Sequence, residues 1–163
     1  MTHELFREFV IRLASQIGVE VARDQIESPL QFAIGEQRVI LDQDVSTQSP
    51  ELIIHAEIGR IDERRELEVM RMLLEGNYLW SQTGGATLGV NSQTREVVLA
   101  WKAPLSAIPT GQVAGDVLAH FLTIAGAWAA YLDGEAFELP DQDDEPAPGL
   151  DAGSGLTAQF IRV

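Results

Sequence analysis

Side chains that commonly bind metals or catalyse reactions are few and scattered in this chain. The three histidines, His3, His55 and His120, lie far apart and show none of the short spacings of zinc sites. Cysteine is absent, which excludes thiolate ligands, a cysteine nucleophile and disulfide bonds. We therefore interpret the histidines as ordinary surface or core residues, and the sequence predicts no metal ion, no cofactor and no catalytic residue.

Two glycine-containing stretches share letters with reactive motifs but lack their structural context. Residues 83–89 follow a helical pattern and precede a strand pattern, whereas a dinucleotide-binding loop needs a strand before it and a helix after it. Gly153-Ser154-Gly155 lies in an acidic tail without the strand, turn and helix of a nucleophile elbow. These stretches predict neither phosphate binding nor hydrolysis, and we interpret the protein as a non-enzyme.

Composition predicts one folded domain followed by a tail. The chain has 163 residues, of which 45% are hydrophobic, so it can form a substantial core. Its 25 acidic and 11 basic residues give a net charge of -14. Nucleic acids and anionic membrane surfaces repel such a charge, so neither is expected as a partner.

Two features of the sequence predict the cellular compartment of the protein. The first residues carry acidic groups and lack the basic start, apolar run and cleavage site of a signal peptide. The longest apolar run, 117–132, is interrupted by His120 and Thr123 and is shorter than the roughly 20 residues of a membrane span. We expect a cytoplasmic protein in which this run is a buried helix.

Hydrophobic periodicity predicts an α+β fold in the order helix, three strands, helix, two strands, helix. Apolar residues recur at helical spacing in three segments and alternate with polar residues in five. The helices are predicted at 5–17, 62–80 and 111–132, and the strands at 30–34, 39–41, 52–58, 86–90 and 96–102.

The second predicted helix is apolar over most of its circumference. One arc contains Leu67, Met70, Leu74 and Tyr78, and the other contains Val69, Met72, Leu73, Leu79 and Trp80. A helix of this kind must be covered on more than one side. Its own sheet provides one cover, and a second copy of the chain provides the other most simply, since symmetric dimers are the commonest oligomers.

Residues 73–90, LLEGNYLWSQTGGATLGV, carry a family resemblance. The stretch resembles class I chaperones of bacterial type III secretion, the Tir chaperone or CesT family. In that family a helix of the form LLxxNxLW precedes a short turn similar to GGATLG and the last two strands of the sheet. The predicted order of elements over residues 1–135 is also similar to the family layout.

The resemblance implies a homodimeric domain over 1–135, with a twisted antiparallel sheet flanked by helices. The acidic, flexible tail that we expect over 136–163 is longer than the family core requires. The second helix and the fourth strand would form the dimer interface. The residues expected there are Val69, Met72, Leu73, Leu79, Trp80 and Leu88.

The resemblance further implies a chaperone that binds the N-terminal segment of a secreted effector, keeps it soluble and competent for secretion, and delivers it to the secretion ATPase without using ATP itself. An extended segment of this kind can add a strand to a sheet edge and place apolar side chains in grooves. The residues expected to bind it, on the first helix and fifth strand, are Leu5, Phe6, Phe9, Val10, Val98 and Trp101.

Two other classes of function remain open at this point. A regulatory protein could use the same fold to bind a partner that is not an effector. An enzyme with a small-molecule pocket would need a convergent polar site, which the sequence does not reveal.

The tail differs from the rest of the chain in composition. No basic residue occurs between Lys102 and Arg162, and residues 141–149 are typical of a solvated linker. Residues 157–163 then alternate apolar and polar positions. We predict that this terminal segment docks as a strand on the edge of the chain's own sheet, the kind of edge that an effector segment would use. The alternative is a disordered tail that keeps the protein soluble.

Overall fold

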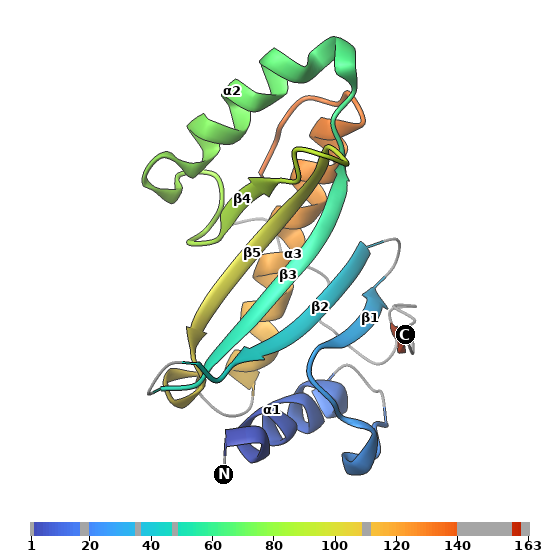
Figure 1. Cartoon of the computed structure of the whole chain (residues 1–163), viewed down its shortest axis with the longest axis vertical. Coiled ribbons are helices and arrows are strands. Elements are labelled where there is room, and N and C mark those ends of the chain that lie inside the picture. The colour runs from blue at the N-terminus through green and yellow to red at the C-terminus, as the bar shows by residue number, and fades with distance from the viewer. Residues whose placement is uncertain are drawn as a thin grey trace.

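The computed structural model describes residues 2–16, 20–34, 37–46, 49–108, 112–139 and 158–160. These residues form three α-helices and a six-stranded sheet (Figure 1). The helices are α1 (Thr2–Gln16), α2 (Glu66–Asn77) and α3 (Gln112–Leu132), and the strands are β1 (Leu30–Ile34), β2 (Gln37–Asp44), β3 (Glu51–Arg60), β4 (Thr87–Val90), β5 (Glu96–Pro104) and β6 (Ala158–Phe160). The predicted α+β fold and its order of elements are confirmed, and β6 is added at the end.

All strand pairs in the sheet are antiparallel, in the spatial order β4-β5-β3-β2-β1-β6. The strands β1, β2 and β3 follow one another as neighbours, and β5 then pairs with β3 on its other side. The segment that contains α2 and β4 lies between β3 and β5 in the chain. The chain thus places α2 beside the β4 end of the sheet, far from β1 (Figure 1).

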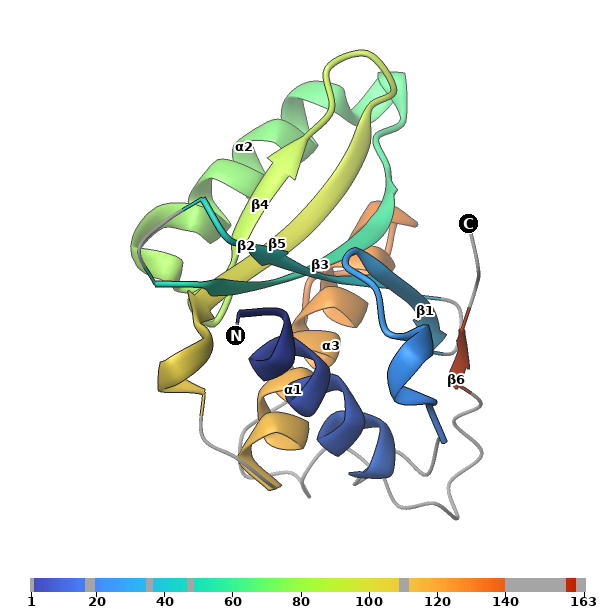
Figure 2. The ribbon, with the colours of Figure 1, turned by 60° about the horizontal axis from the view of Figure 1, so that its bottom comes forward.

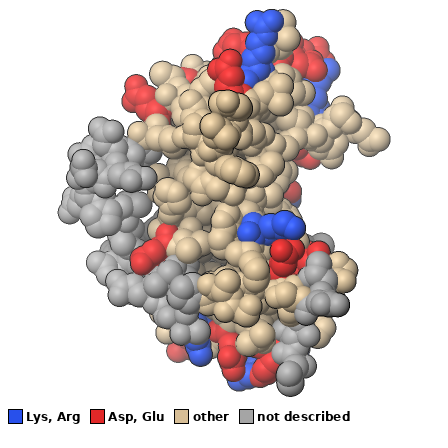
Figure 3. Space-filling view, turned by 90° about the vertical axis from the view of Figure 1, so that its left-hand side faces the viewer, with Lys and Arg blue, Asp and Glu red and all other residues tan. Residues whose placement is uncertain are grey.

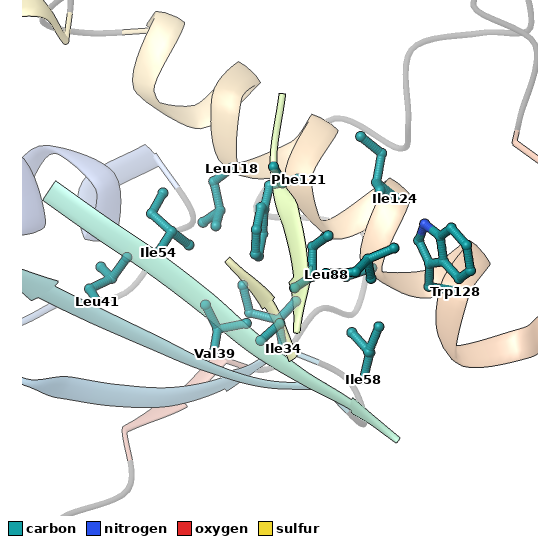
Figure 4. Close-up of a cluster of buried hydrophobic side chains, with 14 of the residues drawn as sticks. Ile34, Val39, Leu41, Ile54, Ile58, Leu88, Leu118, Phe121, Ile124 and Trp128 are labelled. Carbon is teal, nitrogen blue, oxygen red and sulfur yellow. The ribbon is translucent and has the colours of Figure 1, made fainter. Parts of the chain in front are cut away.

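The core lies between one face of the sheet and the helices α1 and α3, which both lie on that face (Figure 2). Alternation along the strands buries every second side chain, as in Leu52, Ile54 and Ala56 of β3. Helix α3 is apolar around much of its surface, and Figure 4 shows Leu118 and Phe121 close to strand residues of this core. The third predicted helix is therefore a core helix.

The opposite face of the sheet carries half-buried residues. They are Ile40 of β2, Ile53 and His55 of β3, and Val98 and Ala100 of β5. Figure 3 views the molecule from the side, at 90° to Figure 1, and shows an outline that is indented at mid-height. The same face also carries the ion pairs Arg38–Glu57 and Lys102–Glu51, so its accessible surface is mixed apolar and charged.

Helix α2 is shorter than predicted. The carboxylate of Asp62 accepts a hydrogen bond from the backbone N–H of Arg64 at 2.8 Å and caps the 3-10 turn that leads into α2. At the other end α2 stops at Asn77, because Leu79 and Trp80 adopt positive φ angles of 53° and 55°. The predicted helix over 62–80 therefore contains a capped entry turn, the helix and a left-handed exit.

Candidate protein-binding surfaces

Within the described ranges, no three His, Cys, Asp or Glu side chains gather closely enough to hold a metal ion. The same residues contain no helix long and apolar enough to cross a membrane. The side chain of His3 contacts the amide of Gln43 at 2.6 Å, while His55 lies on the outer sheet face and His120 on α3.

An apolar stripe runs along the outer side of α2. Leu67 and Leu74 lie seven residues apart, about two helical turns, and Tyr78 follows four residues later; the three are 68%, 72% and 71% exposed. Leu79 and Trp80 continue the stripe beyond the end of the helix and are also exposed. Large apolar side chains that cluster on a surface in this way are typical of a protein interface.

Charged residues of both signs flank this stripe. A hollow of about 510 Å³ lies beside α2 and is lined by Arg64, Leu67, Glu68, Arg71, Met72, Glu75 and Tyr131. The stripe thus has an apolar centre with a charged border, the usual arrangement of a protein–protein interface.

The structure divides the six residues that were expected at a dimer interface. Val69, Leu73 and Leu88 are buried in the core of the chain itself, Met72 is partly buried, and Leu79 and Trp80 are exposed. The expected arc of α2 thus faces its own sheet, and the arc with Leu67 and Leu74 faces outward. Both arcs are apolar, so periodicity alone could not tell which of them the sheet covers.

Two contacts with Trp128 of α3 fix the exit from α2. The indole Nε1 of Trp128 donates a hydrogen bond to the carbonyl oxygen of Gln82 at 3.0 Å. A Cβ atom at Gly76 would lie 2.5 Å from Cζ2 of the same ring, so only glycine permits this approach. The positive φ angles of Leu79 and Trp80, which are costly for bulky residues, are held by this packed surrounding.

Asn77, the last residue of α2, holds the outer edge of β4. Its side-chain amide donates to the carbonyl oxygen of Leu88 at 3.0 Å, and its side-chain oxygen accepts from the backbone N–H of Leu88 at 2.9 Å. These two bonds imitate the pairing that a further strand would make. Asn77 thereby satisfies backbone groups that would otherwise be unpaired at this edge.

Arg65 anchors the start of α2 to the end of α3. Its guanidinium donates to the carbonyl oxygens of Tyr131 and Leu132 at 3.2 and 3.3 Å, and lies 5.1 Å from the centre of the Tyr131 ring. The last carbonyls of a helix lack partners within it, and a cation is favourable there. Helix α2 is thus attached to α3 at both ends, with its apolar stripe facing outward.

Glu68 completes this anchor. Its carboxylate accepts hydrogen bonds from Arg65 at 3.0 Å and from the hydroxyl of Tyr131 at 3.2 Å. The hydrogen bond from Arg65, followed by that from Tyr131, lowers the pKa of Glu68. Burial, with the hydrogen bond to Glu68, raises the pKa of Tyr131. The charged form of the glutamate is therefore the one that fits the fold.

The sequence model of the Tir chaperone protein (CesT) family matches residues 9–124, which is more than two thirds of the chain. The chain belongs to this family. A comparison with curated protein sequences returns no match. Among solved structures, a chain of the "Crystal Structure of the ExsC-ExsE Complex" is similar, with a TM-score of 0.61, 18% identity, and coverage of 81% of this chain and 96% of that one. At this identity the likeness shows a shared fold.

The structure shows the roles of four residues in the stretch LLEGNYLW of this Tir chaperone family member. Leu73 is in the core, Leu74 is on the outer stripe, Gly76 touches Trp128 and Asn77 holds β4. Sequence reasoning missed the roles of Gly76 and Asn77. A glycine inside a helix and an asparagine at its last turn were the available signals, since both are poor helix formers.

The six residues that were expected to bind a partner of this family member do not form one surface. Phe6 and Val10 are buried in the core, Leu5 is exposed, and Phe9 is partly buried beside the core. Trp101 pairs with Ile54 of β3 and lies on the core face, whereas Val98 pairs with Glu57 and lies on the outer face. In the single chain, Phe6 and Val10 thus lie on the side of α1 that packs against the core.

Proposed function

We propose that this protein is a cytoplasmic, homodimeric chaperone of type III secretion that binds the N-terminal segment of a secreted effector and keeps it soluble and competent for secretion. Membership of the Tir chaperone family supports this proposal. The observation that carries it is the exposed apolar stripe of α2, with Leu67, Leu74 and Tyr78. An exposed apolar stripe of this kind is typical of a surface that binds another protein chain, as a chaperone must.

A second copy of the chain is the proposed cover of the stripe. A large apolar side chain gains about 1.5–3 kcal/mol when it is fully buried, so an uncovered stripe is unfavourable. In a two-fold dimer the same surface meets itself. The basic residues Arg64 and Arg71 and the acidic residues Glu68 and Glu75 border one surface and can therefore pair across the axis. The proposed interface consists of Leu67, Leu74, Tyr78, Leu79 and Trp80, with Met72 at its border.

The proposed effector segment binds elsewhere, in an extended form. Of the expected residues, Leu5 is exposed, and Phe9 on α1 and Val98 and Trp101 on β5 are half-buried, so these four remain accessible to it. The net charge of -14 favours a segment with basic residues. Delivery to the secretion ATPase, which the family resemblance implies, would follow this binding step.

Sedimentation velocity tests the dimer. The wild-type chain should sediment at micromolar concentration with twice its mass of 17.9 kDa. Leu74→Glu should give the single mass with unchanged circular dichroism, because a charge in the apolar centre of an interface is strongly unfavourable. Leu139→Glu, which changes an exposed leucine outside α2, is the matched control and should remain dimeric. A monomeric wild type, or a dimeric Leu74→Glu variant, would contradict the proposal.

Purification from the native host tests the effector. The protein should co-purify with a protein that the type III apparatus secretes, and limited proteolysis of the complex should leave an N-terminal segment of that protein bound. Recovery of a transcription factor or another protein that is never secreted would favour a regulatory module instead.

A further inference from the structure

Each edge of the sheet has a cover made by the chain itself. At the β4 edge, the side chain of Asn77 pairs with the backbone of Leu88. At the β1 edge, the strand β6 pairs with β1 in antiparallel register (Figure 2). The register sets Phe32 opposite Phe160, Ala33 opposite Gln159, and Ile34 opposite Ala158. The predicted docking of the terminal segment as an edge strand thus has a counterpart in the structure at Ala158–Phe160.

The pairing at β1 uses backbone groups that any extended segment carries. On its inner side β1 pairs with β2 along all five residues from Leu30 to Ile34. On its outer side the described residues of β6 pair with Phe32, Ala33 and Ile34. A partner segment that adds a strand at this edge needs the same outward backbone groups of β1. It can therefore bind there only when β6 has been displaced.

We propose that β6 is a tethered competitor that occupies the docking edge for an extended segment of a partner protein, and that the partner segment displaces it. The identity of the partner rests on the chaperone function proposed above. Because β6 belongs to the same chain, its effective concentration at the edge is in the millimolar range that is common for tethered segments. Short or poorly matched segments then lose this competition, and the edge does not pair with the edge of another molecule.

The register also defines the chemistry of the segment that fits. Phe32 and Ile34 have buried side chains, and Ala33 between them is half-buried on the other side of the strand. Strands that pair place directly opposed residues on the same face. The fitting segment therefore has apolar residues at two positions two apart and a polar residue between them. The chain's own segment has Ala158 and Phe160 at these register positions and Gln159 between them.

The test uses the full chain and, as probe, a fluorescein-labelled peptide with the sequence of residues 156–163. The double variant Ala158→Pro with Gln159→Pro removes the backbone N–H groups of both residues, at least one of which must donate to β1 if they pair. The control, Ala158→Val with Gln159→Thr, keeps both N–H groups and favours a strand. Fluorescence anisotropy should show at least tenfold tighter peptide binding by the proline variant than by the wild type or the control. Equal binding by wild type and proline variant, or no binding by either, would overturn the proposal.

Amide hydrogen exchange gives an independent test of the proposal on the wild-type chain. The amides of 158–160 should be protected, and the amides of 30–34 should exchange faster in the proline variant than in the wild type. Unprotected amides at 158–160 would overturn the proposal even if the variant failed to fold. Neither measurement uses an effector. A negative result would therefore contradict the edge competition and leave the proposed chaperone function untouched. Conversely, evidence against the chaperone function would not affect the result of either measurement.

Discussion

Gly76 of α2 lies against the indole ring of Trp128 in α3, so closely that a Cβ atom on Gly76 would be 2.5 Å from Cζ2 and 2.9 Å from Cη2 of the ring. Trp128 is fully buried. The glycine therefore sets how closely the end of α2 approaches the core. It thereby also sets the position of Leu79 and Trp80, which follow α2 in the chain.

Gly76→Ala should destabilise the protein. Helix propensity alone would favour alanine by about 1 kcal/mol, whereas overpacking against a buried ring costs typically about 1–3 kcal/mol. Urea unfolding should show a lower midpoint for this variant. Gly89→Ala is the matched control, because a Cβ at Gly89 meets nothing within 4 Å. A rise in the midpoint for Gly76→Ala would mean that the ring moves aside without cost.

Asn77→Ala should cost about 1–3 kcal/mol of unfolding free energy, because it leaves the part-buried N–H and carbonyl of Leu88 without their partner. Asn77→Asp should be at least as damaging, since a carboxylate oxygen would then face the Leu88 carbonyl oxygen. Asn91→Ala removes hydrogen bonds from an exposed turn and should cost less, because water can replace them. Chemical denaturation of the three variants measures the difference, and equal losses would argue against an edge role for Asn77.

Leu5→Glu and Phe6→Glu should have different effects although they are adjacent on α1. Leu5 is 46% exposed, so its change to glutamate should leave the fold intact and weaken capture of the effector. Phe6 is 1% exposed, so Phe6→Glu should unfold the domain, since a charge in an apolar core costs several kcal/mol. Circular dichroism separates folding from binding. A folded Phe6→Glu variant that lost only its partner would restore Phe6 as a binding residue.

Stability should fall in acid, in part through Glu68 and Asp44. Hydrogen bonds from Arg65 lower the pKa of Glu68, and hydrogen bonds from Ser46 lower that of Asp44. A carboxyl whose pKa is lower in the folded state stabilises the fold above its unfolded pKa, and this contribution is lost as the pH falls through the folded pKa. The melting temperature should therefore drop below about pH 4.

Glu68→Gln tests that assignment. The variant should melt lower than the wild type at pH 7, and the two melting temperatures should converge as the pH falls toward 3. Glu8→Gln, which alters an exposed glutamate of α1, serves as the control and should follow the wild-type curve. A constant difference between Glu68→Gln and wild type over the whole range would contradict the role of the ionised carboxylate.

Periodicity in the sequence predicted the elements well because burial on one face of a strand or helix leaves a clear pattern. In β3, for example, Leu52, Ile54 and Ala56 face the core and alternate with less buried residues. The same kind of pattern failed on α2, since Val69 and Leu67 are both apolar although only Val69 packs against the sheet. Which apolar arc faces inward depends on tertiary contacts, above all those of Arg65 and Trp128 with distant residues.

The assignment of partner-binding residues on β5 could have been improved from the sequence. Val98 and Trp101 are three positions apart in one strand, so their side chains must lie on opposite faces. By contrast, the positive φ angles of Leu79 and Trp80 had no signal in residue type, because bulky residues rarely adopt them. These two residues lie between Gly76 and Gln82, which both contact Trp128, so their conformation depends on a tertiary contact.

The family match ends at residue 124, whereas β6 begins at Ala158. The residues that cover the β1 edge are therefore encoded separately from those that build most of the core. Mutations at 158–160 can strengthen or weaken the cover without changing any residue that the family model matches. Natural selection can in this way change the threshold for partner entry separately from the part of the chain that the family shares.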